Sequence, residues 1–209
     1  MNLIGLALWF PGVLSATPSR PALPQNFLPV PIIRQANTYS CGAAALAAVL
    51  HYWQVFDGPE THLYERLETT PNDGTEPSRI VKVAREFGLK AAWKHRLNLE
   101  AIESALKKGE TVILDIQAWR DEASEPVPWK DTWEDGHYVV LIAMDQDNVY
   151  VMDPAVASGY GYMPKQELMD RWHDYEDRGG MVRRYHHLAI FIRGKNSLKG
   201  FPTPLTRLQ

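Results

Sequence analysis

The sequence has only one cysteine, Cys41, among 209 residues. This excludes an intramolecular disulfide, so packing must stabilise the fold, and hydrophobic residues make up an ample 45% of the chain. Strong charge of one sign is also lacking, because the formal net charge is −3 and there is no basic or acidic block. No nucleic-acid partner is therefore predicted. No apolar run is long enough to cross a bilayer, which argues against an integral membrane span.

The chain is predicted to form one domain with flanking segments. Residues 1–17 are mostly apolar and resemble a signal peptide, although the usual positive residues at its start are missing. Export to the periplasm, the cell envelope or the exterior is expected, and a buried strand in a cytoplasmic protein is the alternative. Residues 18–29 are rich in proline and predict an extended linker. The domain is expected over 30–195, followed by a C-terminal tail over 196–209.

Helical patterns come first in the domain and strand patterns second. The run from Cys41 to Trp53 is apolar on nearly all faces and predicts a central, buried helix. Further helices are predicted over 61–67, 77–87, 99–108 and 165–172. Short β-branched and aliphatic runs predict strands over 111–116, 138–144, 149–152 and 188–192. This order favours an α+β fold in which the central N-terminal helix packs on an antiparallel sheet.

Cys41 begins the predicted central helix, and Ser40 before it is a suitable N-cap residue. Backbone N–H groups and the positive end of the helix dipole both favour a thiolate at this position. Cys41 is therefore a candidate nucleophile. The alternative is that it is a small buried hydrophobic residue, which is common for an unpaired cysteine.

Two downstream residues are candidates to assist the thiol. His137 begins one predicted strand, and Asp153 ends the next. A cysteine nucleophile needs a base such as histidine, and a third group orients the imidazole. In an antiparallel hairpin the numbers of two paired residues have a constant sum. His137 and Asp153 lie directly opposite if this sum is 290, which requires a turn of about five residues centred on Asp145. A tighter turn would offset them and require a bulge. Asp115 is an alternative carboxylate within its own predicted strand.

Three segments together resemble the C39 family of papain-like cysteine peptidases, in particular its stand-alone members. They are 35–42, 136–140 and 149–154, which read QANTYSCG, GHYVV and VYVMDP. The similarity extends over about 30–193 and implies a papain-like fold. It also implies that Cys41 is the nucleophile, His137 the general acid and base, Asp153 the orienting residue and Gln35 an oxyanion-hole donor.

The resemblance predicts hydrolysis of a peptide or related amide bond, in a peptide or protein substrate, through a thioester intermediate. Two alternatives stay open: an acyltransferase with the same triad, and a non-catalytic module that binds peptides. Ser40 replaces the acidic residue usual in bacteriocin exporters, and the chain has neither the membrane spans nor the nucleotide-binding motif of those transporters, so cleavage after a double glycine is not carried over. Gly179 and Gly180 are predicted to form a turn.

No cofactor or metal is predicted, because adjacent His186 and His187 would point to opposite faces of a strand and no further ligands complete a site. The long connection before His137 contains Trp119, Trp129 and Trp133. These aromatic residues are expected either to line a substrate cleft or to pack within the loop. The sequence does not indicate an oligomeric state.

Overall fold

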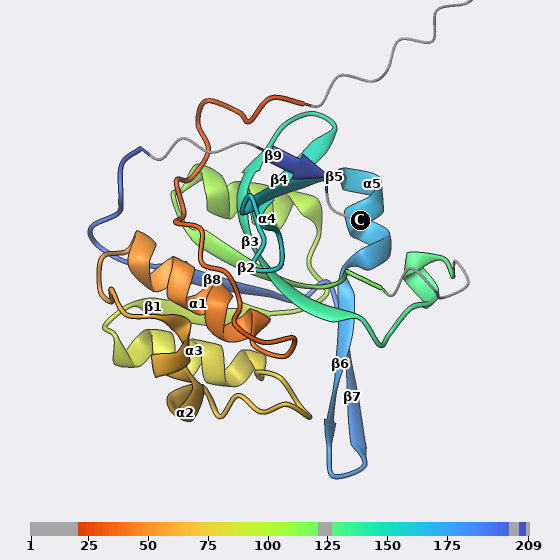
Figure 1. Ribbon diagram of the computed structural model, residues 1–209. Coiled ribbons are helices and arrows are strands. Elements are labelled where there is room, and N and C mark those ends of the chain that lie inside the picture. The colour runs from red at the N-terminus through yellow and green to blue at the C-terminus, as the bar shows by residue number, and fades with distance from the viewer. Residues whose placement is uncertain (1–20, 121–126, 201–204, 208–209) are drawn as a thin grey trace, which may run out of the picture.

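A seven-stranded sheet lies at the centre of the computed structural model, which describes residues 21–120, 127–200 and 205–207 (Figure 1). The strand order is β1-β8-β2-β3-β4-β5-β9. Each neighbouring pair is antiparallel except β5 and β9, which are parallel. The strands are β1 (Lys90–Lys94), β2 (Thr111–Gln117), β3 (Gly136–Met144), β4 (Asn148–Met152), β5 (Tyr160–Pro164), β8 (Ala189–Arg193) and β9 (Leu205–Arg207).

Helices cover both faces of this sheet. One face packs against α1 (Cys41–Tyr52) and α3 (Pro77–Glu86), with the short elements η1 (Glu60–Leu63) and α2 (Tyr64–Leu67) beside them. The other face packs against α4 (Leu99–Lys107) and α5 (Lys165–Arg171). Figure 1 shows this layered arrangement. The α+β prediction is confirmed, as is the packing of the first helix on an antiparallel sheet.

Helix α1 is the most buried helix of the domain. Ten of its twelve residues are buried, and five of the twelve are alanine, the residue with the highest helix propensity. Ser40 occupies the N-cap position as predicted, but its side chain makes no capping hydrogen bond. The Ser40 hydroxyl instead contacts the Asn37 carbonyl oxygen at 3.2 Å and Glu60 Oε1 at 3.0 Å. The capping role expected for this side chain is therefore wrong.

The β3–β4 hairpin differs from the predicted register. Its turn spans three residues, 145–147, and the pairing shifts at a bulge between Leu141 and Ala143. Beyond the bulge, Val140 pairs with Met152, so the numbers of two paired residues sum to 292 instead of the predicted 290. His137 and Asp153 are therefore offset along the strands and not directly opposed. The tighter turn with a compensating bulge is the arrangement that forms.

A separate two-stranded hairpin was not among the predicted elements. It consists of β6 (His173–Arg178) and β7 (Met181–His186), and it extends away from the body of the domain (Figure 1). Polar and charged residues make up most of both strands, so the strands lack the apolar alternation that predicts a strand. Gly179 and Gly180 connect them with φ angles of 62° and 89°, which confirms the predicted turn.

The segments that flank the predicted domain also contact it. Leu23, Phe27 and Leu28 pack against the core, and the Leu28 N–H donates to the Ile142 carbonyl oxygen at 2.8 Å. Part of the predicted C-terminal tail forms strand β9, so it joins the sheet through backbone hydrogen bonds. The predicted signal-like segment 1–17 lies outside the described residues, and export stays a prediction. Within the described part of the chain, none of the helices has the length and apolar character needed to cross a membrane.

A candidate cysteine peptidase site

Helix α1 presents Cys41 at its first residue, where the side chain is partly exposed and lines a cavity of about 640 Å³. His137 is the second residue of β3, and its ring is buried, with 5% exposure. The two side chains interact, because a hydrogen bond to Cys41 is among the causes that raise the pKa of His137. The structure thus brings together two predicted residues that are 96 positions apart (137 − 41) in the chain.

Asp153, directly after β4, is the third member of this arrangement. Its Oδ1 lies 2.7 Å from His137 Nε2, and both side chains are buried. Burial opposes a charge on the ring, but the charge and hydrogen bond of Asp153, together with Cys41, raise the pKa of His137 to about 10. Burial likewise opposes ionisation of Asp153, yet the His137 charge and several donors keep its pKa below the usual value. The geometry therefore favours an imidazolium paired with a carboxylate at neutral pH.

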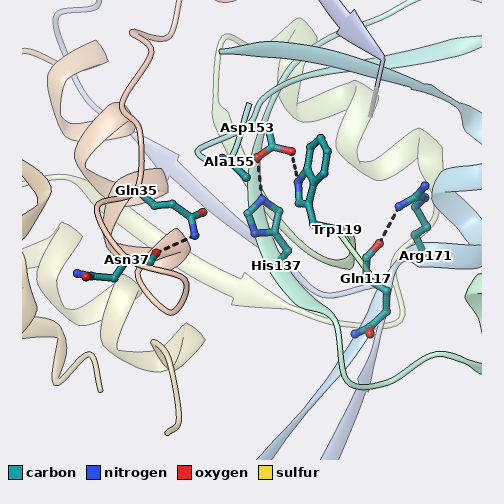
Figure 2. A network of polar contacts seen from close by, with 8 residues as sticks. All are labelled: Gln35, Asn37, Gln117, Trp119, His137, Asp153, Ala155 and Arg171. Atoms are coloured by element: carbon teal, nitrogen blue, oxygen red, sulfur yellow. Dashed lines mark hydrogen bonds and ion pairs between the residues drawn. The ribbon is translucent and has the colours of Figure 1, made fainter. Parts of the chain in front are cut away.

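Asp153 accepts further hydrogen bonds that the sequence did not reveal. The Ala155 N–H donates to Oδ1 at 2.8 Å, and the indole N–H of Trp119 donates to Oδ2 at 3.0 Å (Figure 2). Trp119 has a φ of 64°, a left-handed conformation that is uncommon for a bulky residue. Of the two roles expected for Trp119, packing is the one observed, because its ring packs against the core and it does not line the cavity beside Cys41. Its indole N–H also holds the carboxylate that contacts His137.

Gln35 extends from the segment before α1 toward His137 (Figure 2). Its Nε2 donates to the Asn37 carbonyl oxygen at 2.8 Å, which uses one of the two N–H groups of the amide. The Gln35 backbone N–H donates to the Pro154 carbonyl oxygen at 3.1 Å, so this segment is tied to the residue after Asp153. The fourth predicted site residue therefore lies on the same side of the domain as the other three.

A buried carboxylate, Glu60, anchors the segment that carries Gln35. Its Oε1 accepts from the Ala36 N–H at 2.5 Å, the Ser40 hydroxyl at 3.0 Å and the Tyr64 hydroxyl at 2.8 Å. Glu60 is only 3% exposed. Sequence reasoning missed this residue, because no pattern connects a glutamate in a short 3-10 helix to a loop 20 positions earlier.

Two glycines of the predicted motifs are required by close packing. A Cβ atom at Gly42 would lie 2.7 Å from the Thr75 Cβ, and one at Gly136 would lie 2.3 Å from Asp174 Oδ2. Both separations are shorter than real contacts of a Cβ atom. The residue after Cys41 and the residue before His137 must therefore lack a side chain if the neighbouring elements are to keep their positions.

Gly42→Ala is expected to reduce the free energy of unfolding by about 1–3 kcal/mol, because the added methyl group clashes with Thr75. The direction of this change is informative, because Gly→Ala in a helix otherwise increases the free energy of unfolding by about 1 kcal/mol. Urea unfolding followed by circular dichroism measures the change. Ser104→Ala within α4 serves as a control for helix propensity alone. A Gly42→Ala variant as stable as the wild type would show that the helix and the Thr75 segment separate easily.

The other candidates from the sequence have different roles. Asp115 pairs with Tyr138, whereas Ile116 pairs with His137, so Asp115 and His137 point to opposite faces of the sheet. Asp115 is thus excluded as the orienting carboxylate. Trp129 lies 3.6 Å from the guanidinium carbons of both Arg120 and Arg171.

Trp133 is the tryptophan that lines the cavity beside Cys41, and its ring also contacts His173 and His186. His187 Nδ1 lies 2.9 Å from the Leu97 carbonyl oxygen. Across the described ranges, no group of three or more histidine, cysteine or acidic side chains could hold a metal ion.

A sequence model of the Peptidase_C39 like family matches residues 27–179, which is most of the chain. The chain belongs to this family. Among relatives of this C39-like protein is an uncharacterized protein of Methanothermobacter thermautotrophicus, 34% identical over 126 residues, which cover 60% of this chain and 72% of the relative. A second uncharacterized protein, from Methanothermobacter marburgensis, is 30% identical over 60% of this chain and 72% of its own.

Solved structures share the fold of this C39-like protein at low sequence identity. A double glycine motif protease from an AMS/PCAT transporter, solved with its leader peptide, has a TM-score of 0.56 at 23% identity and covers 82% of this chain and 96% of its own. A C39-like peptidase of Bacillus anthracis, described as putative, has a TM-score of 0.57 at 20% identity over 81% of this chain and 96% of its own. The peptidase domain of Streptococcus ComA has a TM-score of 0.57 at 19% identity over 79% and 99%. The resemblance and the fold class predicted from the sequence are confirmed.

Proposed function

We propose that this C39-like protein is a cysteine peptidase that hydrolyses a peptide or related amide bond. The observation that carries the proposal is the chain of contacts from Cys41 to His137 to Asp153, with the His137–Asp153 distance at 2.7 Å. The position of Cys41 at a helix N-terminus supports it, because backbone N–H groups and the helix dipole favour a thiolate there. Membership of the family supports the reaction class.

In the first half of the reaction, the Cys41 thiolate attacks the carbonyl carbon, a C–S bond forms and the carbonyl oxygen becomes an oxyanion. The second N–H of Gln35 Nε2 and the Cys41 backbone N–H donate to this oxygen. Since Nε2 of His137 is bound to Asp153, Nδ1 is the nitrogen available on the side of the thiol. The Nδ1 proton passes to the leaving amine as the C–N bond breaks, which leaves a thioester and a neutral imidazole.

In the second half, His137 removes a proton from water while the water oxygen attacks the thioester carbonyl carbon. The same two donors hold the new oxyanion. When the C–S bond breaks, the acid product leaves and the thiolate–imidazolium pair is restored. Asp153 keeps the ring orientation through both halves, and it accepts from Trp119 and Ala155 without taking part in proton transfer.

Alkylation of Cys41 by iodoacetamide at pH 6 tests the proposal. The wild type should react about tenfold or more faster than glutathione, because only a thiolate reacts and the imidazolium stabilises it. His137→Ala should reduce the rate to that of an ordinary thiol. Since the chain has a single cysteine, intact-protein mass spectrometry measures the rate without ambiguity.

His95→Ala is the matched control, since His95 is exposed and lies outside the contacts described for Cys41, His137 and Asp153. It should react like the wild type. If the wild type reacts no faster than glutathione, or if His137→Ala leaves the rate unchanged, the peptidase proposal is wrong and a peptide-binding module becomes the better explanation. Hydrolysis that persists in purified Cys41→Ala would belong to another protein in the preparation.

A further inference from the structure

The cavity beside Cys41 is strongly acidic. Its lining residues come from the start of α1, the segment 68–79, strands β2 and β3 and the β6–β7 hairpin. Eight of them are aspartate or glutamate, and Arg79 is the one lysine or arginine among the lining residues that the structure describes. Arg79 is paired with Glu68 at 2.5 Å, so it does not offset the remaining carboxylates. The formal net charge of the whole chain is only −3, so this acidity is a local property.

Two of these carboxylates, Asp115 and Asp174, lie together in the wall of the cavity. Asp115 on β2 is 3% exposed, and its Oδ1 is buried without a hydrogen-bond partner. Asp174 on β6 hydrogen-bonds to Asp115, and its Oδ1 accepts from Gln117 Nε2 at 3.1 Å. A buried carboxylate oxygen without a donor is costly, so its presence in the wall of a cavity calls for a ligand that supplies one.

The shifted pKa values of the two carboxyl groups agree with this requirement. Burial and the negative charge of Asp174 raise the pKa of Asp115 well above its usual range, and burial raises the pKa of Asp174 to about 6. Burial and mutual repulsion therefore oppose a full negative charge on both carboxyl groups at once. A cationic group at this position would relieve that repulsion and would give Oδ1 of Asp115 its missing donor.

The pair is also close to the candidate nucleophile. Asp115 faces Tyr138 across the β2–β3 ladder, and both residues line the cavity with Cys41. The charge of Cys41 contributes to the raised pKa values of Asp115 and Tyr138. The aromatic rings of Tyr138 and Trp133 line the same cavity and can cover an aliphatic stem that ends in a positive charge.

We propose that this cavity is a specificity pocket for a lysine or arginine side chain close to the scissile bond of a peptide substrate, with Asp115 and Asp174 as the residues that bind its charge. The assignment rests on the proposed peptidase function, because the cavity can determine specificity only if Cys41, which lines it, is the nucleophile. The proposed substrates are basic peptides.

Peptide binding to the Cys41→Ala variant tests the pocket without any catalytic step. The probes are two acetylated and amidated pentapeptides, Ala-Ala-Lys-Ala-Ala and the same peptide with norleucine in place of lysine. They have the same backbone and nearly the same stem, and they differ by one positive charge. An NMR titration in 50 mM salt should show at least tenfold tighter binding of the lysine peptide.

The preference should depend on the two buried carboxyl groups. Asp115→Asn and Asp174→Asn, each made in the Cys41→Ala background, should reduce it to less than threefold. Both substitutions keep the size of the side chain, and thermal unfolding confirms that each variant is folded. Asp57→Asn, which removes an exposed carboxylate that does not line this cavity, should leave the preference unchanged.

Equal affinities for the two peptides, or no binding of either, would overturn the pocket. A preference that survives both Asn variants would also overturn it, because general attraction to an acidic surface would then be sufficient. The alkylation experiment reports separately on the proposed function. If the thiol is reactive but the two peptides bind equally, the protein is a peptidase of another specificity. If the thiol is unreactive but the lysine peptide binds more tightly, the cavity is a binding cleft for basic peptides.

Discussion

Gln35→Ala is expected to slow peptide hydrolysis about 10²–10³-fold, with most of the loss in kcat, because one donor to the developing oxyanion is removed. The Gln35 side chain is directed toward His137, and one amide N–H is bound to the Asn37 carbonyl oxygen (Figure 2). This bond fixes the amide so that its other N–H is available. The measurement is the initial rate on a peptide that the wild type cleaves, identified from a peptide library.

The comparison of two reactions distinguishes an oxyanion role from a general loss of structure. Alkylation by iodoacetamide forms no oxyanion, so Gln35→Ala should change that rate by less than about twofold while hydrolysis falls. Gln35→Glu should be at least as slow, because a carboxylate can neither donate to Asn37 nor stabilise a negative oxygen. Gln166→Ala, at an exposed position of α5, is the control. Equal losses in both reactions would assign Gln35 a structural role instead.

Sequence patterns indicated the places of Cys41, His137 and Asp153, because each lies at the end of an element whose pattern is clear, whereas Gln35 followed only from the family resemblance. The apolar run after Cys41 predicts a helix start there, and the aliphatic runs beside His137 and Asp153 predict strand ends. Strand ends of one hairpin must lie close together, so the contact between His137 and Asp153 tolerates an error in register. The observed bulge changes which residues face one another without separating these two.

The residues that support the site could not be predicted in the same way. The indole of Trp119 reaches Asp153 from a residue with left-handed backbone, which no local propensity indicates for tryptophan. Glu60 reaches the Gln35 segment from a short 3-10 helix. Asp174 meets Asp115 because a charged hairpin folds beside the sheet, and its strands carry no apolar alternation. Each of these contacts depends on tertiary structure that the sequence pattern does not contain.

Asp153→Asn is expected to slow hydrolysis about 10²–10⁴-fold, although it preserves the shape of the side chain. Three donors meet the carboxylate: His137 Nε2–H and the Ala155 N–H at Oδ1, and the Trp119 indole N–H at Oδ2. An asparagine offers one oxygen and one NH₂ group. If the asparagine oxygen points toward His137, the NH₂ group faces the indole N–H of Trp119, and two donors meet. If the amide is reversed, the NH₂ group faces the N–H donors of His137 and Ala155. The substitution also removes the negative charge that stabilises the imidazolium.

The conflict with the indole donor predicts a specific rescue. Trp119→Phe alone should slow hydrolysis only about tenfold, since Asp153 keeps the two donors at Oδ1. In the double variant no donor opposes the NH₂ group, so the asparagine can direct its oxygen to His137. The double variant should therefore be about tenfold faster than Asp153→Asn instead of tenfold slower, which is a coupling of about 2.7 kcal/mol. The four values of kcat/KM that form the double-mutant cycle measure it.

Trp129→Phe combined with Asp153→Asn is the control for this cycle, because Trp129 packs on Arg120 and Arg171 and not on Asp153. It should give no rescue. If Trp119→Phe and Asp153→Asn are additive, the indole does not select the orientation of the group that holds His137. A rescue confined to Trp119 would instead show that a loop residue outside the predicted triad determines which atom of residue 153 faces the imidazole, and hence which nitrogen of the neutral His137 ring carries the proton.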